Sequence, residues 1–132
     1  MNRRLFFPLL LFLVLCLWAG CNQPTPEEQA GKAAKEYYDR LVAGDYEAFL
    51  RGRAGSDSLP ADYRQQLLQA CELLVRQQKK AHGGITEITL SNAKRDTTLH
   101  LTQAFLLLTF RDSTQEEIVV PMIEQGGRWL MK

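Results

Sequence analysis

The sequence of 132 residues predicts an α+β fold in which N-terminal helices pack on a curved, four-stranded antiparallel sheet. Up to His82, apolar residues recur at spacings of three and four, which is the period of an amphipathic helix. After Gly84 the period changes toward alternation, which is typical of strands with one buried face. Short polar segments divide the rest of the chain into four β-segments, and this arrangement indicates a meander.

The N-terminal residues have the pattern of a secretory signal. Arg3 and Arg4 precede an apolar run from Leu5 to Trp18. A helix that spans a membrane needs roughly 20 apolar residues, so this run is too short to be one. We therefore expect residues 1–20 to be a signal peptide that is removed.

The signal ends in the sequence LWAGC, where Cys21 follows Ala19 and Gly20. This segment resembles the lipobox of bacterial lipoproteins, although Trp18 stands where that pattern has a smaller aliphatic residue. The resemblance implies that Cys21 is lipidated, with a diacylglyceryl thioether and a palmitate-type N-acyl chain, and becomes the mature N-terminus. Several acyl chains on one residue suffice for stable anchoring. We therefore expect a lipoprotein of the bacterial cell envelope, anchored at the periplasmic or surface face of the outer membrane without spanning it.

The mature chain has the size of one domain. Removal of residues 1–20 leaves 112 residues, of which 21–27 form a polar, proline-bearing tether and 28–132 the domain. Without Arg3 and Arg4 the chain has 14 basic and 15 acidic side chains, a net charge of about −1. This balance gives no electrostatic footprint for nucleic acid.

Cysteine and histidine usage excludes several kinds of site. Cys16 leaves with the signal and Cys21 takes the lipid, so only Cys71 remains and no disulfide is expected. We interpret Cys71 as a small core residue, because nothing around it in the sequence would lower the pKa of its thiol. The mature chain has no H-x-H, H-E-x-x-H or C-x-x-C spacing, so we expect neither a metal nor another cofactor.

Three helices are predicted. The first begins near Pro26 and ends at Gly44, the second is a short helix capped by Asp45, and the third runs over residues 61–82 and ends at Gly83. The third helix carries an apolar face that we expect to pack, made of Leu67, Leu68, Cys71, Leu74 and Val75.

The C-terminal end of this third helix is basic. Lys79, Lys80 and His82 complement the helix dipole there, which is the interpretation we favour. An anionic partner is the alternative.

The predicted strands cover residues 85–96, 97–110, 115–125 and 128–132. The middle of the second strand, Ala104 to Leu108, is apolar at every position, so we expect both of its faces to be covered. Pro121 cannot donate a ladder hydrogen bond and is expected at a bulge or an edge-facing position.

Two segments carry a resemblance to a known superfamily. AAKEYYDRLVAGDYEAFL resembles the opening helix pair of the nuclear-transport-factor-2-like superfamily, and VVPMIEQGGRWLMK is similar to its closing hairpin. The blocks QQKKAHGGI and EEIVVPM also resemble small lipoproteins of uncharacterised function from Bacteroidota. The superfamily resemblance implies a cone, in which a bent sheet wraps over the long helices and leaves an apolar cavity at the wide end. Because its members include enzymes and binding proteins, the resemblance does not fix the function.

The sequence offers one weak candidate for catalysis. Enzymes of this superfamily place an aspartate, histidine or tyrosine in the cavity, where burial shifts its pKa. His100 is the best general base on offer, because as a strand residue it would share a face with Thr102 and Ala104. Tyr37 and Tyr38 are neighbours on a helix, so one of them can point into the cavity, although we favour core packing for both.

These observations leave three hypotheses. The leading one is a non-catalytic, lipid-anchored domain that binds a small apolar ligand or an envelope protein partner. The second is a small isomerase or dehydratase with His100 as general base. The third is a structural envelope component that self-associates as a homodimer.

Overall fold

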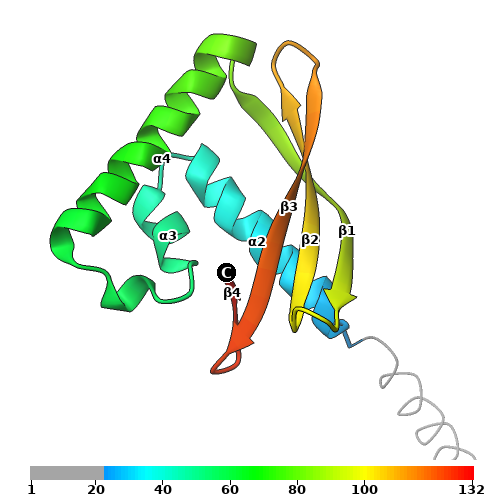
Figure 1. Ribbon diagram of the computed structural model, residues 1–132. Helices are drawn as coiled ribbons and strands as arrows, with labels where there is room; N and C mark the ends of the chain where they lie inside the picture. The colour runs from blue at the N-terminus through cyan, green and yellow to red at the C-terminus, as the bar shows by residue number, and fades with distance from the viewer. Residues whose placement is uncertain (1–22) are drawn as a thin grey trace, which may run out of the picture.

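The computed structural model describes residues 23–132, and within them the helices precede the strands (Figure 1). The predicted signal peptide and Cys21 lie outside the described residues. Helix α2 spans Pro26–Val42, α3 spans Tyr46–Arg51, a short 3-10 helix η1 spans Ser56–Ser58, and α4 spans Ala61–His82. The strands are β1 (Ile85–Asp96), β2 (Leu101–Phe110), β3 (Gln115–Gln125) and β4 (Arg128–Met131).

The helix ends follow from side-chain caps and glycines. The Thr25 side chain accepts a hydrogen bond from the Glu28 amide at 3.2 Å, so α2 begins at Pro26 and includes the last two residues of the predicted tether. Asp45 caps α3 by accepting from the Ala48 amide at 3.1 Å, as predicted. Gly83 adopts a left-handed φ of 78° at the end of α4, again as predicted.

The four strands form one antiparallel sheet in the order β1-β2-β3-β4, so the predicted α+β fold class is confirmed. The β1–β2 register shifts between Leu90 and Asn92, and an irregularity of this kind bends a sheet. The Pro121 carbonyl accepts from the Lys132 amide at 2.9 Å. The ring nitrogen of Pro121 therefore faces the β4 side at the end of the pairing, which is the predicted edge-facing position.

The core lies between α2 and the inner face of the sheet (Figure 1). Small residues allow this close packing, because a Cβ added at Gly31 would stand 2.8 Å from a Leu90 methyl group. Ala30 and Ala34 are fully buried beside it. The sheet contributes Ile88, Leu101, Ala104, Leu106, Leu108, Phe110, Val120, Met122 and Met131 to the buried apolar residues, and the helices contribute Ala30, Ala34, Leu41 and Leu50.

The sheet is covered on one face only, which corrects the expectation for the middle of β2. Ala104, Leu106 and Leu108 point toward α2 and are buried, whereas Phe105 and Leu107 are only half-buried. Both helical layers of the described residues lie on the same side of the sheet (Figure 1). The outer face therefore keeps partly exposed apolar side chains.

Candidate functional site

Helix α4 stands away from the sheet and joins it at its C-terminal end (Figure 1). None of its 22 residues is buried, although an apolar face was expected to pack. The half-buried positions, Leu67, Leu68, Cys71 and Val75 among them, recur at helical spacing and so define the face turned toward the molecule. Leu74 is 45% exposed, at the border of that face.

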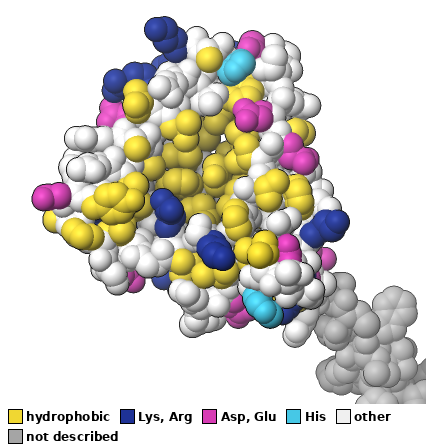
Figure 2. All heavy atoms as spheres, viewed as in Figure 1, with side chains coloured by type: hydrophobic (Ala, Val, Ile, Leu, Met, Phe, Trp, Pro, Cys, Tyr) yellow, Lys and Arg dark blue, Asp and Glu magenta, His cyan; other side chains and the backbone are white. Residues whose placement is uncertain are grey.

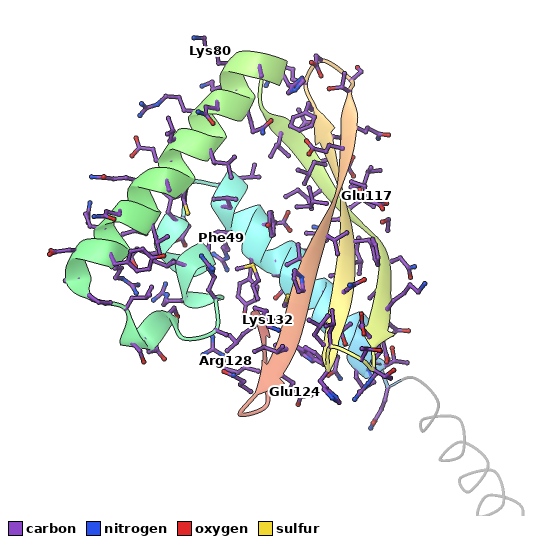
Figure 3. The ribbon with its side chains drawn as sticks, viewed as in Figure 1. Phe49, Lys80, Glu117, Glu124, Arg128 and Lys132 are labelled. Atoms are coloured by element: carbon purple, nitrogen blue, oxygen red, sulfur yellow. The ribbon has the colours of Figure 1, made fainter. Side chains whose placement is uncertain are left out.

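A hollow lined by hydrophobic side chains opens between α4 and the sheet (Figure 2). Figure 3 places Phe49 of α3 inside it and Lys132 at its lower end. Tyr38, Val42 and Ile118 are hydrophobic side chains that pack on the core yet stay partly exposed. We call this space, between the inward face of α4 and Tyr38, Phe49 and Ile118, the apolar hollow.

Smaller cavities lie along α4. One of about 230 Å³ lies where α4 meets the end of α2 and the start of β1, and Val42, Val75 and Ile85 contribute to its lining. A second of about 70 Å³ lies beside Arg53, Tyr63 and Leu67 near the other end of the helix. The gap between α4 and the rest of the domain is therefore incompletely filled at both ends.

Tyr38 sits at the boundary of the core and the apolar hollow. Its ring meets Phe49 edge-on, with centroids 5.3 Å apart and an interplanar angle of 84°. Burial raises the pKa of the Tyr38 phenol, and the positive charge of Arg53 partly offsets that rise. The phenol has no hydrogen-bond partner among residues 23–132, yet none of their buried side-chain oxygens is unsatisfied, so the hydroxyl reaches solvent.

Arg53 supplies a positive charge in the neighbourhood of Tyr38. Its backbone pairs with Met131, since the Met131 amide donates to Gly52 at 2.7 Å and the Ala54 amide donates to Met131 at 2.8 Å. The Arg53 side chain is exposed and makes no ion pair or side-chain hydrogen bond within residues 23–132. It therefore offers five free donors beside Tyr38.

Cys71 faces the same region from α4. Burial raises the pKa of its thiol, and Arg53 lowers it by a smaller amount. This raised pKa agrees with the prediction that nothing around Cys71 lowers the pKa of its thiol. It is half-buried rather than a core residue, because α4 does not close onto the core.

His100 occupies the turn before β2 rather than the strand itself. Its φ of 53° is left-handed, and the residue is exposed. It borders a cavity of about 180 Å³ together with Arg95, Thr102, Glu124 and Trp129. The polar sequence DTT before it favours a turn, which explains why the strand begins at Leu101. Its role as general base stays a prediction.

Tyr37, the other tyrosine of the pair, is structural. Its hydroxyl donates to the Trp129 carbonyl at 2.7 Å, and its ring lies against Gly52, where an added Cβ would come within 2.4 Å. The pair thus divides its roles, with Tyr37 joining α2 to β4 and Tyr38 reaching the apolar hollow.

His82, Asp112 and Thr114 form a hydrogen-bonded cluster at the end of α4. His82 Nδ1 lies 2.8 Å from Asp112 Oδ2, and the Thr114 hydroxyl donates to Asp112 Oδ1 at 2.6 Å. These bonds lower the pKa of Asp112 to about 2. The Asp112 amide also donates to the His82 carbonyl at 3.2 Å, so the cluster fastens the helix end to the β2–β3 turn. Its His–Asp spacing resembles a catalytic dyad, but the Thr114 hydroxyl is directed at the carboxylate rather than left free as a nucleophile.

A further cavity, of about 580 Å³, lies against α2 and α3. Acidic and basic side chains line it, and its polar character makes it a solvated groove.

Within residues 23–132 no group of three or more His, Cys, Asp or Glu side chains is placed to hold a metal ion. The same residues include no helix long and apolar enough to cross a membrane.

Comparisons with known proteins bear on the fold. No family model matches the chain, and no curated protein matches it. A crystal structure from Campylobacter jejuni, described provisionally as an NTF2-like transpeptidase, matches with a TM-score of 0.61 at 14% sequence identity. The match covers 76% of this chain and 94% of the other. The chain therefore has a nuclear-transport-factor-2-like fold.

Proposed function

We propose that the protein is a lipid-anchored envelope lipoprotein whose domain binds an apolar ligand or a segment of an envelope partner in the apolar hollow. The observation that carries the binding role is α4, a helix of 22 residues with no buried side chain. Its inward apolar face and the exposed sides of Tyr38, Phe49 and Ile118 leave unfilled apolar surface on both walls. Filling that space with an apolar group is favourable by about 25 cal/mol per Å² removed from water.

The anchoring role is supported by the sequence alone, through the signal-like segment and Cys21. Intact-mass measurement on the membrane fraction tests it. We expect a chain that begins at Cys21 and carries the added mass of acyl chains. A chain that keeps residues 1–20, or a mature chain without acyl mass, would contradict the anchor.

Binding is tested with an uncharged fluorescent probe, N-phenylnaphthylamine, added to residues 23–132. Two variants form a matched pair on α4: Leu67 lies on the inward, half-buried face, whereas Leu73 is 51% exposed. We expect L67Q to weaken probe binding about tenfold and L73Q to leave it unchanged, because one buried apolar side chain contributes about 1.5 kcal/mol or more. Equal affinity for the two variants would contradict binding in the apolar hollow.

The description of the structural neighbour as a transpeptidase raises acyl transfer as an alternative for this chain. Such a reaction needs an activated nucleophile, and a thiol is active as its thiolate. The raised pKa of Cys71 does not favour that role. The binding role requires no such group.

A second candidate function is self-association, favoured by the outer face of the sheet. Val119 is 50% exposed there, beside the half-buried Phe105 with which it pairs across the strands. Sedimentation equilibrium tests this role. We expect V119K to shift a dimer toward monomer, while L99K, at a residue 55% exposed in a turn, leaves it unchanged. A parent protein that stays monomeric at high concentration would exclude it.

A further inference from the structure

Part of strand β3 has no neighbouring strand on one of its sides. On the β2 side, pairing covers residues 115–122 of β3, whereas β4 pairs only with residues 122–125. No other strand of residues 23–132 lies on the β4 side of residues 115–120. Figure 1 shows this stretch facing the gap in front of α4. We call residues 115–120 the open edge.

The backbone groups of the open edge are available for pairing. The Lys132 amide donates to the Pro121 carbonyl at 2.9 Å, so Pro121 turns its backbone toward β4. Because alternate residues of an antiparallel strand turn their backbone groups to the same side, Val119, Glu117 and Gln115 do so as well. Their N–H and C=O groups have no hydrogen-bond partner within residues 23–132. All three residues are exposed, so the stretch is a bare edge to which another strand can add.

The open edge borders the apolar hollow. Ile118, in its middle, is one of the residues that define the hollow, and Val120 next along the same face is buried in the core. Side chains that lie directly opposite one another in a sheet point to the same face. A strand added here would therefore turn every second side chain toward the inward face of α4, a helix with no buried residue. Those side chains would fill the hollow, and apolar ones gain most from doing so.

The other face of an added strand would meet a carboxylate. Glu117 points to the outer face of the sheet, where it accepts a hydrogen bond from the Ser91 hydroxyl at 3.2 Å (Figure 3). Neither Glu117 nor its neighbour Glu116 is in an ion pair within residues 23–132. A second copy paired antiparallel about Glu117 would place two carboxylates opposite each other, which is destabilising. A basic side chain opposite Glu117 is the favourable arrangement, so a different protein fits this edge better than a second copy.

The opposite edge of the sheet is less suited to pairing. The β1–β2 register shifts between Ile85 and Glu87 and again between Leu90 and Asn92. Irregularities of this kind bend and twist an edge strand, and they hinder the addition of another strand. The open edge of β3 is therefore the better of the two edges for binding.

We propose that the open edge takes up an extended segment of a partner protein as an added antiparallel strand, with apolar side chains in the apolar hollow and a basic side chain opposite Glu117. The inference rests on the binding role proposed above and specifies the partner segment named there. A small apolar molecule could fill the hollow, but it would leave the amides and carbonyls of the open edge to water. A peptide strand uses both surfaces, because its backbone hydrogen bonds supply affinity and its alternate side chains supply specificity.

The test measures binding of fluorescent heptapeptides to the full chain purified from membranes, by fluorescence anisotropy. Val, Leu or Phe alternates with Thr along each peptide, and Lys replaces the third Thr. One peptide is N-methylated at the Thr and Lys positions, whose amides would face β3, and the matched peptide at the apolar positions, whose amides would face away from it. We expect the first methylation to weaken binding at least tenfold and the second to leave it unchanged, because only the first removes hydrogen bonds to the open edge.

Substitutions in the protein test the same edge. V119P removes an amide that faces away from β2, so the β2–β3 pairing can persist, and V119T is the matched control that keeps the amide. We expect V119P to weaken peptide binding about tenfold and V119T to leave it unchanged. E117K should reverse the charge preference, so that a peptide with Glu in place of Lys binds better than the Lys peptide. Thermal melts confirm that the variants are folded, and the comparison of methylated peptides needs no substitution.

The outcomes separate this inference from the binding role. Equal binding of the two methylated peptides, or an unchanged charge preference in E117K, would overturn the assignment to the open edge. Absence of peptide binding would overturn it too, while N-phenylnaphthylamine binding that depends on Leu67 would keep the binding role. Absence of both peptide and N-phenylnaphthylamine binding would overturn both proposals.

Discussion

Among the glycines of residues 23–132, Gly52 has the least room for an added Cβ. An added Cβ would come within 2.4 Å of the Tyr37 ring, and that ring is fixed by its hydrogen bond to the Trp129 carbonyl. We expect G52A to lower the free energy of unfolding by about 1–3 kcal/mol, because neither side can move freely. Urea denaturation measures the change.

Gly31 provides the control for this substitution. Its added Cβ would meet the terminal methyl groups of Leu90, which can rotate away, and alanine favours a helix by about 1 kcal/mol over glycine. We expect G31A to be close to neutral. Equal destabilisation by G31A and G52A would show that Tyr37 is not the constraint.

Asp112 makes the stability of the fold depend on pH at the acid end of the range. Its pKa of about 2 lies below the value of 3.8 for the free side chain, so the ionised carboxylate stabilises the fold above about pH 4. This contribution is lost as the pH falls through about 2. We expect D112N to have a lower urea midpoint than the parent at pH 7, and the difference to vanish near pH 2. A difference that stays constant with pH would contradict the assigned ionisation.

At the scale of elements, α4 and α2 differ in how they are held. Helix α2 lies on the core with Ala30 and Ala34 fully buried, whereas α4 has no buried residue and is fastened mainly at its ends. We expect amide hydrogen exchange to be faster in the middle of α4 than in α2 by a factor of 10 or more, because local opening of α4 exposes little apolar surface. Equal protection would mean that α4 packs more tightly than described.

The element order was predictable because local signals specify it. Asp45 and Gly83 mark helix boundaries by capping chemistry, and alternation after Gly84 marks strands. The exposure of α4 was not predictable, because an apolar helix face such as Leu67 to Val75 does not show whether another element of the fold packs against it. The prediction that both faces of β2 are covered was wrong for the same reason. The sequence shows that Phe105 and Leu107 are apolar, but only the tertiary structure decides whether another element covers them.

The candidate site was predictable only in part. Tyr38 was foreseen as a possible cavity residue, but Arg53 was missed because it lies in the segment after α3 with no motif around it. Its pairing with Met131, 78 positions later in the chain, brings it to the site, and no local pattern contains that contact. His100 was placed in a strand because its neighbours are β-formers, and the turn beginning at Thr97 displaced it.

At the scale of the whole molecule, the proposed lipid anchor at Cys21 would hold the domain and its apolar hollow beside the membrane. The apolar hollow lies in a domain whose nuclear-transport-factor-2-like fold the structural comparison shows. The domain begins at Pro26, five residues after Cys21, so an anchor at Cys21 would hold the cone close to the membrane surface. Lipids would then be the nearest source of apolar ligand.

Native mass spectrometry of the full chain purified from membranes tests the central claim, that the apolar hollow is a binding site, most directly. We expect a non-covalently bound apolar molecule that leaves on denaturation, is present with L73Q and is lost or much reduced with L67Q. The same molecule bound equally to the parent and to both variants, or to none of them, would contradict the claim.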